Sequence, residues 1–382
     1  MKIFYIANAR MPTEKAHGIQ IMKMCEAFAD AGATVELVLP RRFNFIKKSP
    51  FEYYGVKKNF NITKLPSLDL VRFGKIGFLI QSLSFAGAAL GYVMFKKADI
   101  IYSRDELPLF LLGFFKKNIV WEAHAPKWNF AAKSILKKRR KIIAITRGLK
   151  NFYAEKGAEE NNIFIAPDGV DTARFGGEGK KSEAREKLKL PQGKKIAVYT
   201  GHLYAWKGAD TLIKSAEFLG KDILVYLAGG TAGDIARVRK ELPAGGNIVI
   251  AGARPHSEIS DWQRAADALI LPNTAKDDVS KYYTSPMKLF EYMASGTPIV
   301  SSDLPSIREI LNESNSILVE PDNPEALAAG IERALNDKEL AEKISKRAFA
   351  DAQNHTWEKR AKRILAFIAG RAETKETAKM SA

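Results

Sequence analysis

Cysteine is nearly absent from this chain, and several motifs that would identify common protein classes are missing. The single cysteine among 382 residues, Cys25, excludes an internal disulfide, and its apolar helical surroundings predict a buried, inert thiol. No Asp-x-Asp pair and no histidine and cysteine cluster with metal-ligand spacing occurs, so we expect neither a metal nor another cofactor. The GxGxxG fingerprint is also missing, which argues against a nicotinamide-dependent dehydrogenase.

Acidic residues are scarce in the first 150 positions. This part contains 27 lysines and arginines against 10 aspartates and glutamates, so it carries the whole net charge of +17, and the remainder is balanced. Several of its basic clusters lie beside aromatic residues, which favours an anionic membrane surface as the partner. The alternatives are a solvated basic face and nucleic acid. Nucleic acid is disfavoured because zinc-ligand spacing, an RNP-like motif and a basic heptad helix are all missing.

The apolar segment Ile76–Phe95 is about as long as a membrane span, which needs roughly 20 apolar residues. Its glycines, serines and Gln81 lower the hydrophobicity, and the strand-like Ala98–Tyr102 follows directly. We therefore interpret it as a helix buried within an α/β domain. A helix lying in the membrane interface is the first alternative and a true span the second. The N-terminus runs into a strand without the features of a secretory signal, which predicts a cytoplasmic protein.

Strands and helices alternate in two successive runs, which predicts two doubly wound α/β domains of the Rossmann type. Strands are expected at Lys2–Ala7, Thr34–Leu39, Ile100–Tyr102, Ile119–Glu122, Ile142–Ile145 and Ile163–Ala166, and, after a linker at Gly176–Glu183, at Ile196–Thr200, Leu224–Ala228, Asn247–Ile250, Ala268–Leu271 and Pro298–Ser301. The predicted domains are 1–178 and 179–356, with a helix at 357–369 returning to the first domain and a frayed tail at 370–382. Two such domains facing each other would bind a ligand in the cleft where their strand carboxyl ends meet.

The segment Tyr283–Ser301 predicts a short helix followed by a buried strand. Ser285 is suited to be the N-cap, and Gly296 is suited to end the helix. On this helix Lys288 and Glu291 lie opposite the apolar residues. A lysine in the first turn opposes the helix dipole unless an anion is bound there, so the helix start predicts a phosphate-bearing ligand. The alternative is a solvated face with a weak Lys–Glu pair.

Further candidate residues lie at the carboxyl ends of predicted strands. The loop Gly201–Gly208 follows a strand and opens onto a helix, which places His202 and Lys207 where a diphosphate can bind a helix N-terminus. Gly229 follows the next strand, and either a tight turn or ligand contact explains it. In the first domain His124 follows a strand and is suited to donate to a substrate hydroxyl or phosphate, with a purely structural histidine as the alternative.

Several of these motifs together resemble the family-4 retaining glycosyltransferases of GT-B fold. The resemblance rests on Thr284–Gly296 with its following strand, Gly201–Gly208, Ala166–Phe175 and the N-terminal loop ending at Gly18, and it covers nearly the whole chain. By this similarity the candidate catalytic residues are His124, Lys207 and Lys288, and the candidate donor-binding residues are Gly18, Gly201, His202, Lys207, Gly229, Thr284, Ser285, Pro286, Met287, Lys288 and Glu291.

The resemblance also implies roles for these residues. Glu291 matches the second acid of the family's Glu-x7-Glu motif and would bind the nucleotide ribose, while Lys207 would bind phosphate and His124 would lie near the transferred sugar. Three positions depart from the family pattern: Tyr283 replaces the first motif acid, His202 an arginine and Asp168 an asparagine. Without the first acid, the contacts to the sugar ring are unassigned.

The implied activity is transfer of a sugar, without a metal and with retention, from a nucleotide-diphosphate sugar to a glycan or lipid-linked acceptor of an envelope polysaccharide or glycolipid. Fixed positive charge from the lysines and helix amides would stabilise the departing diphosphate. The acceptor is expected on the basic first domain, with the protein peripheral at the inner face of the membrane. A non-catalytic nucleotide-sugar-binding scaffold and a sugar-nucleotide epimerase are the alternatives.

Overall fold

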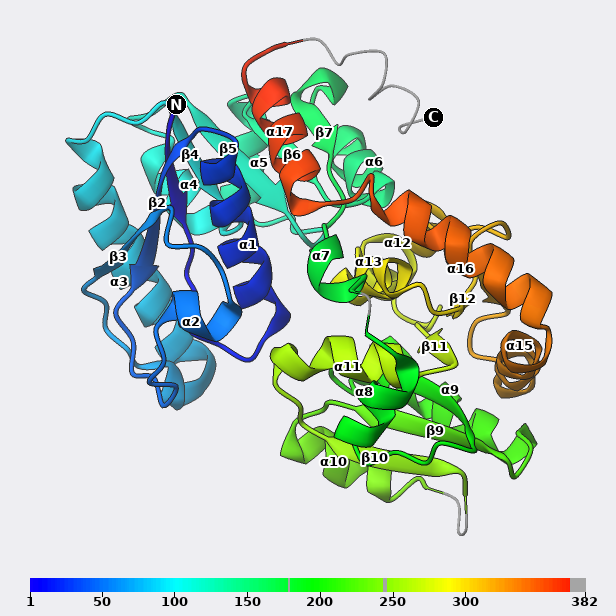
Figure 1. Cartoon of the computed structure of the whole chain (residues 1–382). Coiled ribbons are helices and arrows are strands. Elements are labelled where there is room, and N and C mark those ends of the chain that lie inside the picture. Colours follow the sequence, from blue (N-terminus) through cyan, green and yellow to red (C-terminus); the bar gives the residue numbers. More distant parts are fainter. Residues whose placement is uncertain (178, 243–245, 372–382) are drawn as a thin grey trace. The chain divides into compact units, whose positions relative to one another are not determined.

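The computed structural model describes residues 1–177, 179–242 and 246–371 (Figure 1). The chain divides into two compact units, Met1–Pro167 with Trp357–Ala382, and Asp168–Thr356. Each unit is built on one parallel sheet, so the prediction of two Rossmann-type α/β domains is confirmed. From residue 372 onward the tail expected to fray lies outside the described residues.

The first unit contains a seven-stranded sheet in the order β3-β2-β1-β4-β5-β6-β7. Its strands are β1 Lys2–Ile6, β2 Thr34–Pro40, β3 Asn61–Leu65, β4 Ile100–Ser103, β5 Ile119–Ala123, β6 Lys141–Ala144 and β7 Ile163–Ile165. Its helices are α1 Ala16–Asp30, α2 Pro50–Tyr54, α3 Gly74–Met94, α4 Glu106–Leu112, α5 Phe130–Lys137, α6 Arg147–Glu155 and α17 Trp357–Ile368, with short 3-10 turns η1 Val71–Phe73 and η2 Glu160–Asn162. The strand order reverses between β1 and β4, and sheets of this type bind ligands beyond the strand carboxyl ends at such a point.

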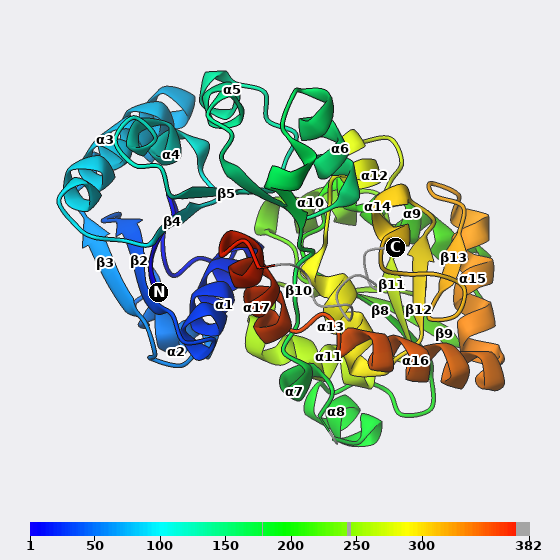
Figure 2. The ribbon, with the colours of Figure 1, turned by 90° about the horizontal axis from the view of Figure 1, so that it is seen from above.

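The helix α17 belongs to the first unit although it comes late in the sequence. It packs on α1 (Figure 2). The ring of Phe367 stacks on that of Phe164 with 5.1 Å between centroids, and the Lys141 ammonium donates to the carbonyl oxygens of Phe367 and Ile368. Aromatic stacking and a lysine bound to the last carbonyls both favour this placement of the helix end.

The second unit contains a six-stranded sheet in the order β10-β9-β8-β11-β12-β13. Its strands are β8 Lys195–Thr200, β9 Ile223–Ala228, β10 Ile248–Gly252, β11 Ala268–Leu271, β12 Ile299–Ser302 and β13 Ile317–Val319. Its helices are α7 Thr172–Phe175, α8 Lys181–Lys187, α9 Ala209–Ser215, α10 Ala232–Arg239, α11 Ile259–Ala265, α12 Asp278–Tyr282, α13 Met287–Ser295, α14 Pro305–Arg308, α15 Pro324–Asn336 and α16 Lys338–Ala352, with 3-10 turns η3 Ala205–Lys207, η4 Ala216–Phe218 and η5 His256–Glu258. Here the order reverses between β8 and β11.

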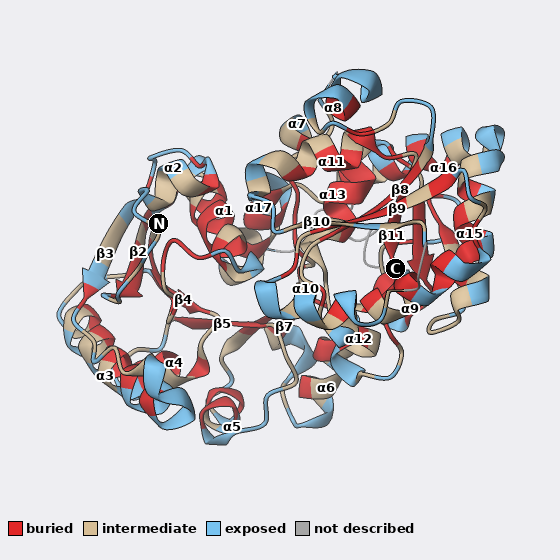
Figure 3. Cartoon of the chain, turned by 90° about the horizontal axis from the view of Figure 1, so that it is seen from below, coloured by how far each residue is buried: buried red, intermediate tan, exposed pale blue. Residues whose placement is uncertain are grey.

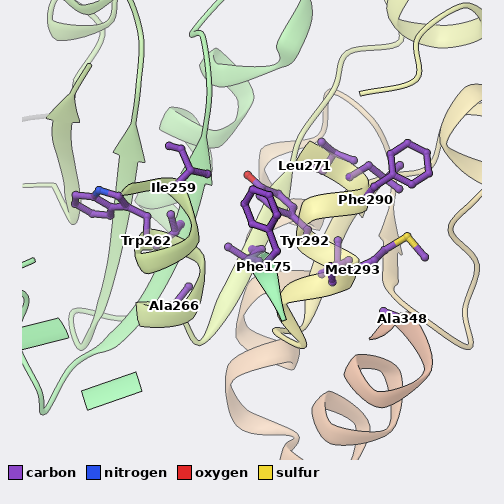
Figure 4. Packing of buried hydrophobic residues seen from close by; sticks show 14 of the residues in the cluster. Phe175, Ile259, Trp262, Ala266, Leu271, Phe290, Tyr292, Met293 and Ala348 are labelled. Atoms are coloured by element: carbon purple, nitrogen blue, oxygen red, sulfur yellow. The ribbon is translucent and has the colours of Figure 1, made fainter. Parts of the chain in front are cut away.

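The core of the second unit is organised around α13. Its residues Phe290, Tyr292 and Met293 are fully buried and pack in one cluster with Phe175 and Leu271 (Figure 4). The predicted apolar face of this helix is therefore confirmed. Because the helix is held on three sides by α7, α11 and α16, its first turn has a fixed position at the carboxyl ends of the strands.

The division between the units lies at 167, whereas the sequence placed the boundary at 178. Val170 pairs with Thr356, and α7 packs on α13, so the stretch after 167 already belongs to the second unit. The predicted linker Gly176–Glu183 is also too long, because α8 begins at Lys181 in a run of residues with high helix propensity.

The eleven strands predicted from the sequence are confirmed, each within two residues at either end. The sequence missed β3 and β13, and both lie at the edge of a sheet. An edge strand has a neighbouring strand on one side only and buries less apolar surface, so its hydrophobic sequence pattern is weaker.

The apolar segment forms α3, and only one stripe of this helix is buried. The inward residues are Gly77, Gln81, Ser82, Phe85, Ala86, Ala89 and Val93. The outer side carries exposed apolar residues (Figure 3). The prediction of a buried helix is therefore correct for one side of α3 and wrong for the other. Among the described residues Val71–Met94 is the one helical stretch long and apolar enough to cross a membrane, with mean hydropathy 1.6 and a third of its apolar window buried.

Candidate functional site

The predicted residues of the second unit gather where its strand order reverses. Lys207 ends the turn η3 in the loop that follows β8, and Gly208 is the N-cap of α9. A Cβ atom at Gly208 would lie 1.6 Å from the carbonyl oxygen of Pro272, which follows β11. Only glycine permits this approach, so the loops after β8 and β11 are locked against each other beside Lys207.

Lys288 lies in the first turn of α13, and its ammonium group is buried over the end of β8. The Nζ atom is 3.7 Å from the centroid of the Tyr199 ring. It has no hydrogen-bond partner among the described residues. Tyr292, one turn later, accepts a hydrogen bond of 2.8 Å from the backbone N–H of Thr200 and so fixes the helix on β8. A buried ammonium without an acceptor is costly, and the arrangement therefore favours an anionic ligand.

Burial and neighbouring charges shift the pKa values of Lys207 and Lys288. Burial lowers the pKa of Lys207 to about 8, and the nearby Asp234 carboxylate opposes this. Burial and then the positive charge of Lys207 hold the pKa of Lys288 well below its usual range. Burial thus favours the neutral form of both lysines, and a bound anion would raise both pKa values.

Three aromatic rings line the loop that carries Lys207. The rings of His202 and Tyr204 stack with 5.0 Å between centroids at 5°, and Tyr204 and Trp206 stack with 6.4 Å at 26°. The Lys207 ammonium lies 5.2 Å from the Trp206 centroid and 5.4 Å from that of Tyr204. His202 Nδ1 is 3.9 Å from a carboxylate oxygen of Asp234. His202 is thus held by stacking and by an acid that the sequence did not indicate.

Glu291 is buried with 7% exposure, and both of its oxygens are engaged. His256 Nε2 lies 3.0 Å from Oε1, and the side-chain amide of Gln263 donates to Oε2 at 3.4 Å. The alternative of a solvated face with a Lys–Glu pair is therefore wrong, because Glu291 is inside and Lys288 makes no hydrogen bond to it. The sequence did not identify His256 in η5 or Gln263 in α11 as partners of Glu291. No sequence pattern in these two elements indicates that they face α13.

The start of α13 differs from the prediction. The helix begins at Met287 with Pro286 at the N-cap and no side-chain cap, so the prediction of Ser285 as N-cap is wrong. The Ser285 hydroxyl instead accepts from the backbone N–H of Asp168 at 3.0 Å. Gly296 ends the helix in the left-handed conformation with φ 68°, as predicted. The first turn of α13 is consequently not capped by a side chain. Thr284 lies in the connection between α12 and α13, directly after Tyr283, the C-cap of α12.

Close packing explains the predicted glycines Gly18 and Gly229, and backbone conformation explains Gly201. A Cβ atom at Gly229, where φ is 136°, would lie 2.2 Å from the carbonyl oxygen of Gly201. Gly18 lies in the first turn of α1, and a Cβ atom there would lie 2.1 Å from the Tyr54 hydroxyl. Gly201 has φ 118°, which favours glycine. Contact of Gly18, Gly201 and Gly229 with a ligand stays a prediction.

In the first unit His124 belongs to a buried ionic network. Its Nε2 lies 2.8 Å from Oε1 of Glu122, which is fully buried at the end of β5. The same oxygen accepts from the guanidinium of Arg360 on α17 at 2.8 Å and from the side-chain amide of Gln20 at 2.6 Å, and Tyr102 donates to Oε2. One carboxylate therefore orients the histidine and binds the late helix to the sheet.

This network sets the protonation of His124. Burial alone would raise the pKa of Glu122, but Arg360 and the hydrogen bond from His124 hold it well below its usual range. Burial and the charge of Arg104 lower the pKa of His124 to about 4. The ring is thus neutral at neutral pH, and because an ionised carboxylate only accepts, Nε2 carries the proton. The remaining Nδ1 is an acceptor, which corrects the prediction that His124 donates to a substrate.

Arg104 and His17 complete the polar groups near the reversal point of the first sheet. Arg104 follows β4 and donates to Gln20 Oε1 at 2.7 Å. Burial and the charge of Arg104 lower the pKa of His17 to about 4. The sequence did not single out Arg104, Glu122 or Arg360. A charged residue inside an otherwise apolar strand was the available signal for Glu122.

A cavity of about 820 Å³ lies elsewhere in the second unit and contains none of the predicted residues. It is found near the amino ends of β8, β11 and β12, the opposite edge from Lys207 and Lys288. Two of its basic residues, Lys181 and Arg185, are paired with Asp267 at 2.6 Å each. The cavity is therefore separate from the predicted lysine site.

Comparison with known proteins agrees with the resemblance seen in the motifs. Residues 180–351 match the family model described as glycosyl transferases group 1. A D-inositol 3-phosphate glycosyltransferase of Xylanimonas cellulosilytica is 24% identical over 221 residues, 55% of this chain and 51% of that protein. An uncharacterized glycosyltransferase of Methanocaldococcus jannaschii is 25% identical over 326 residues, 78% of each chain. This chain spans about half the length of the inositol-phosphate glycosyltransferases that it matches.

The fold is shared with solved glycosyltransferase structures. The structure of Anabaena Alr3699/HepE in complex with UDP and glucose matches with a TM-score of 0.76 and 16% identity, over 97% of this chain and 99% of that one. The GT-B fold expected from the motifs is therefore confirmed, with its parallel sheets of seven and six strands.

We expect Arg360→Met to lower the free energy of unfolding by about 3–5 kcal/mol, because it leaves Glu122 buried and uncompensated. Urea unfolding measures the effect. Lys362→Met on the same helix is the control, since its pair with Glu358 is 61% exposed on both sides and should change stability by less than about 0.5 kcal/mol. Equal stability of the two variants would show that the buried pair does not hold α17.

Acid should destabilise the first unit from about pH 6.5 downward. His17 and His124 have pKa values of about 4 against an ordinary 6.5, so between these values the unfolded chain binds more protons and stability falls as the pH falls. The expected loss is on the order of 3 kcal/mol for each histidine. Calorimetric unfolding across this range tests it. The double variant with His17→Gln and His124→Gln should show a flatter dependence, and an unchanged slope would contradict the prediction.

Binding of inorganic pyrophosphate should take up protons, since the anion raises the pKa values of Lys207 and Lys288. At pH 8 Lys207 alone should bind about half a proton. Calorimetric titrations in buffers of different ionisation enthalpy measure the uptake. Lys288→Met should weaken binding and reduce the uptake, whereas Lys214→Met, an exposed lysine on α9, should change neither. Binding without proton uptake would mean that both lysines are already charged in the free site.

Proposed function

We propose that this chain, whose second unit carries a glycosyl transferases group 1 domain, is a retaining, metal-independent glycosyltransferase that uses a nucleotide-diphosphate sugar. The observation that carries the proposal is the buried ammonium of Lys288, which has no acceptor among the described residues and lies beside Lys207. Pyrophosphate oxygens would supply the missing acceptors. The structure of Alr3699/HepE holds UDP and glucose, which makes a uridine diphosphate sugar the first donor to test.

In the proposed reaction the bond between the anomeric carbon and the diphosphate oxygen breaks, and the acceptor hydroxyl oxygen forms the new bond. The proton of that hydroxyl passes to the departing diphosphate. The two ammonium groups and the uncapped N–H groups of α13 would stabilise the negative charge that develops on this leaving group. Because protein groups supply this charge, we expect transfer to continue in the presence of a chelator.

Glu291 and His124 have different tasks in this proposal. Glu291, held by His256 and Gln263, would accept hydrogen bonds from the ribose hydroxyls. His124 would accept a hydrogen bond from a sugar hydroxyl at Nδ1, because its Nε2 proton is committed to Glu122. Retention of configuration is carried over from the family resemblance alone.

The acceptor is proposed to be a glycan or lipid-linked molecule of envelope polysaccharide or glycolipid synthesis, with the protein peripheral at the inner face of the membrane. The excess of basic residues in the first 150 positions supports this, since anionic lipid attracts such a surface. A non-catalytic nucleotide-sugar-binding protein is the second candidate. It is motivated by Tyr283 and His202, which replace charged residues of the family motifs.

A thermal-shift panel of nucleoside diphosphates and their sugars identifies the donor, because a ligand that binds only the folded state raises the melting temperature. We expect the uridine compounds to give the largest shift. Lys207→Met and Lys288→Met should each weaken binding at least about tenfold, the loss of one charged hydrogen bond, and Glu291→Gln should reduce affinity for the nucleotide sugar.

Release of nucleoside diphosphate with a membrane-lipid extract as acceptor then tests turnover. Lys214→Met serves as the matched control in both assays. Binding without turnover would support the non-catalytic alternative, and conversion of donor without acceptor would indicate an epimerase. Unchanged binding in Lys207→Met and Lys288→Met would remove the basis of the proposal.

A further inference from the structure

The first half of α3 has the reverse of the pattern expected for a surface helix. Its outer stripe at i, i+3 and i+7 consists of Ile76, Leu79 and Leu83, which are 74%, 56% and 50% exposed. Its inner side places Gln81 and Ser82 against the sheet. A helix that faces water normally has polar residues outside and apolar residues inside. The outer stripe therefore indicates that something apolar covers it.

Specific hydrogen bonds keep the inner side of α3 on the sheet. The Gln81 amide donates to Asn8 Oδ1 at 2.8 Å, and the Asn8 amide donates to Ser82 Oγ at 2.9 Å. The helix is thus fixed in the first unit by polar contacts that a membrane-spanning position would break. This excludes a span as the reason for the apolar outer stripe.

Two neighbouring loops extend the apolar stripe. Leu68 donates its backbone N–H to Ser84 on α3 at 3.0 Å, and Asp69 next to it accepts from the backbone N–H of Phe43 at 2.8 Å. These contacts hold the loops 41–48 and 67–73 beside the first half of α3. They add Phe43, Phe45 and Phe73, which are 79%, 60% and 60% exposed. We call these three phenylalanines together with Ile76, Leu79 and Leu83 the docking surface.

Basic side chains lie beside the phenylalanines of the docking surface. Residues 41–83 contain nine lysines and arginines and two acidic residues, and Arg42, Lys48 and Lys57 are ion-paired with Asp69, Glu52 and Asp30. Arg72 lies 4.7 Å from the centroid of the Phe73 ring, and Arg10 lies 4.4 Å from that of Phe45. Cationic heads beside exposed rings are suited to bind lipid phosphates while the rings enter the acyl region.

We propose that the docking surface inserts into the interface of an anionic lipid bilayer, so that α3 lies in the plane of the membrane. The basic rim selects a lipid surface as the occupant, because a second copy of this chain would bring the same positive charge against itself. The inference rests on the proposed membrane-linked acceptor and deepens it. The proposed function requires only electrostatic attraction to the membrane, whereas this inference adds insertion of the docking surface into the lipid.

Flotation with vesicles of about one third anionic lipid tests the insertion. We expect the wild-type protein to float with them and the double variant Ile76→Ser with Leu79→Ser to lose at least about tenfold in partition coefficient. Both side chains are exposed, so the variant should keep the wild-type melting temperature. Phe218→Ser is the matched control, since this phenylalanine is 49% exposed in the second unit and should float as the wild type does.

A fluorescent label measures insertion directly. Cys25 is buried, so an environment-sensitive thiol dye will react selectively with an introduced cysteine. The label on Leu79→Cys should brighten and shift to shorter wavelength on anionic vesicles, whereas the same label on Phe218→Cys should not change. Equal flotation of the double variant and the wild type, or no response of the label at position 79, would overturn the insertion.

The remaining outcomes separate the inference from its premise. If the wild-type protein does not float and is a dimer in light scattering that Ile76→Ser with Leu79→Ser converts to monomers, the surface covers a second copy and the inference is wrong. Nucleoside-diphosphate binding by thermal shift should be the same in the double variant and the wild type. Failure of donor binding with intact vesicle binding would overturn the proposed function and leave the docking surface standing.

Discussion

The buried ammonium of Lys288 is the constraint around which the second unit is built. A charge in this place is unfavourable when the site is empty, and the fold tolerates it through the Tyr199 ring and a lowered pKa. In the proposed complex, diphosphate oxygens would supply the hydrogen-bond acceptors that the buried ammonium lacks. Tyr292 and the core contacts of α13 keep the ammonium from moving to solvent. The affinity for an anion thus depends on packing as much as on charge.

The first unit handles its buried charge in the opposite way. Glu122 is completely satisfied, by Arg360, Gln20, Tyr102 and His124, and has no need of a ligand. The Glu122 carboxylate has two effects. It binds α17 to the sheet through Arg360, and it keeps the proton of His124 on Nε2. A substitution of Arg360 in α17 can therefore change the protonation of His124 without direct contact between the two residues.

The sequence predicted what depends on local pattern and missed what depends on neighbours far along the chain. Eleven strands and the end of α13 at Gly296 follow from apolar runs and a glycine, whereas β3 and β13 escape because edge strands need little apolar surface. The partners of Glu291 and Glu122 escaped for a different reason. His256 and Arg360 are 35 and 238 positions away from them, and no periodicity brings such pairs together.

The outer stripe of α3 shows why the prediction of a buried helix is correct for only one side of it. Its serines, glycines and Gln81 lower the mean hydropathy and indeed argue against a span, but mean hydropathy does not tell which side each residue faces. In the first half of α3 the polar Gln81 and Ser82 lie inside, against Asn8, and the apolar Ile76, Leu79 and Leu83 lie outside. A helix can be anchored in a domain by its polar side and still present an apolar side to a membrane. For such a helix the position of the polar residues, and not their number, decides between a core helix and an interfacial one.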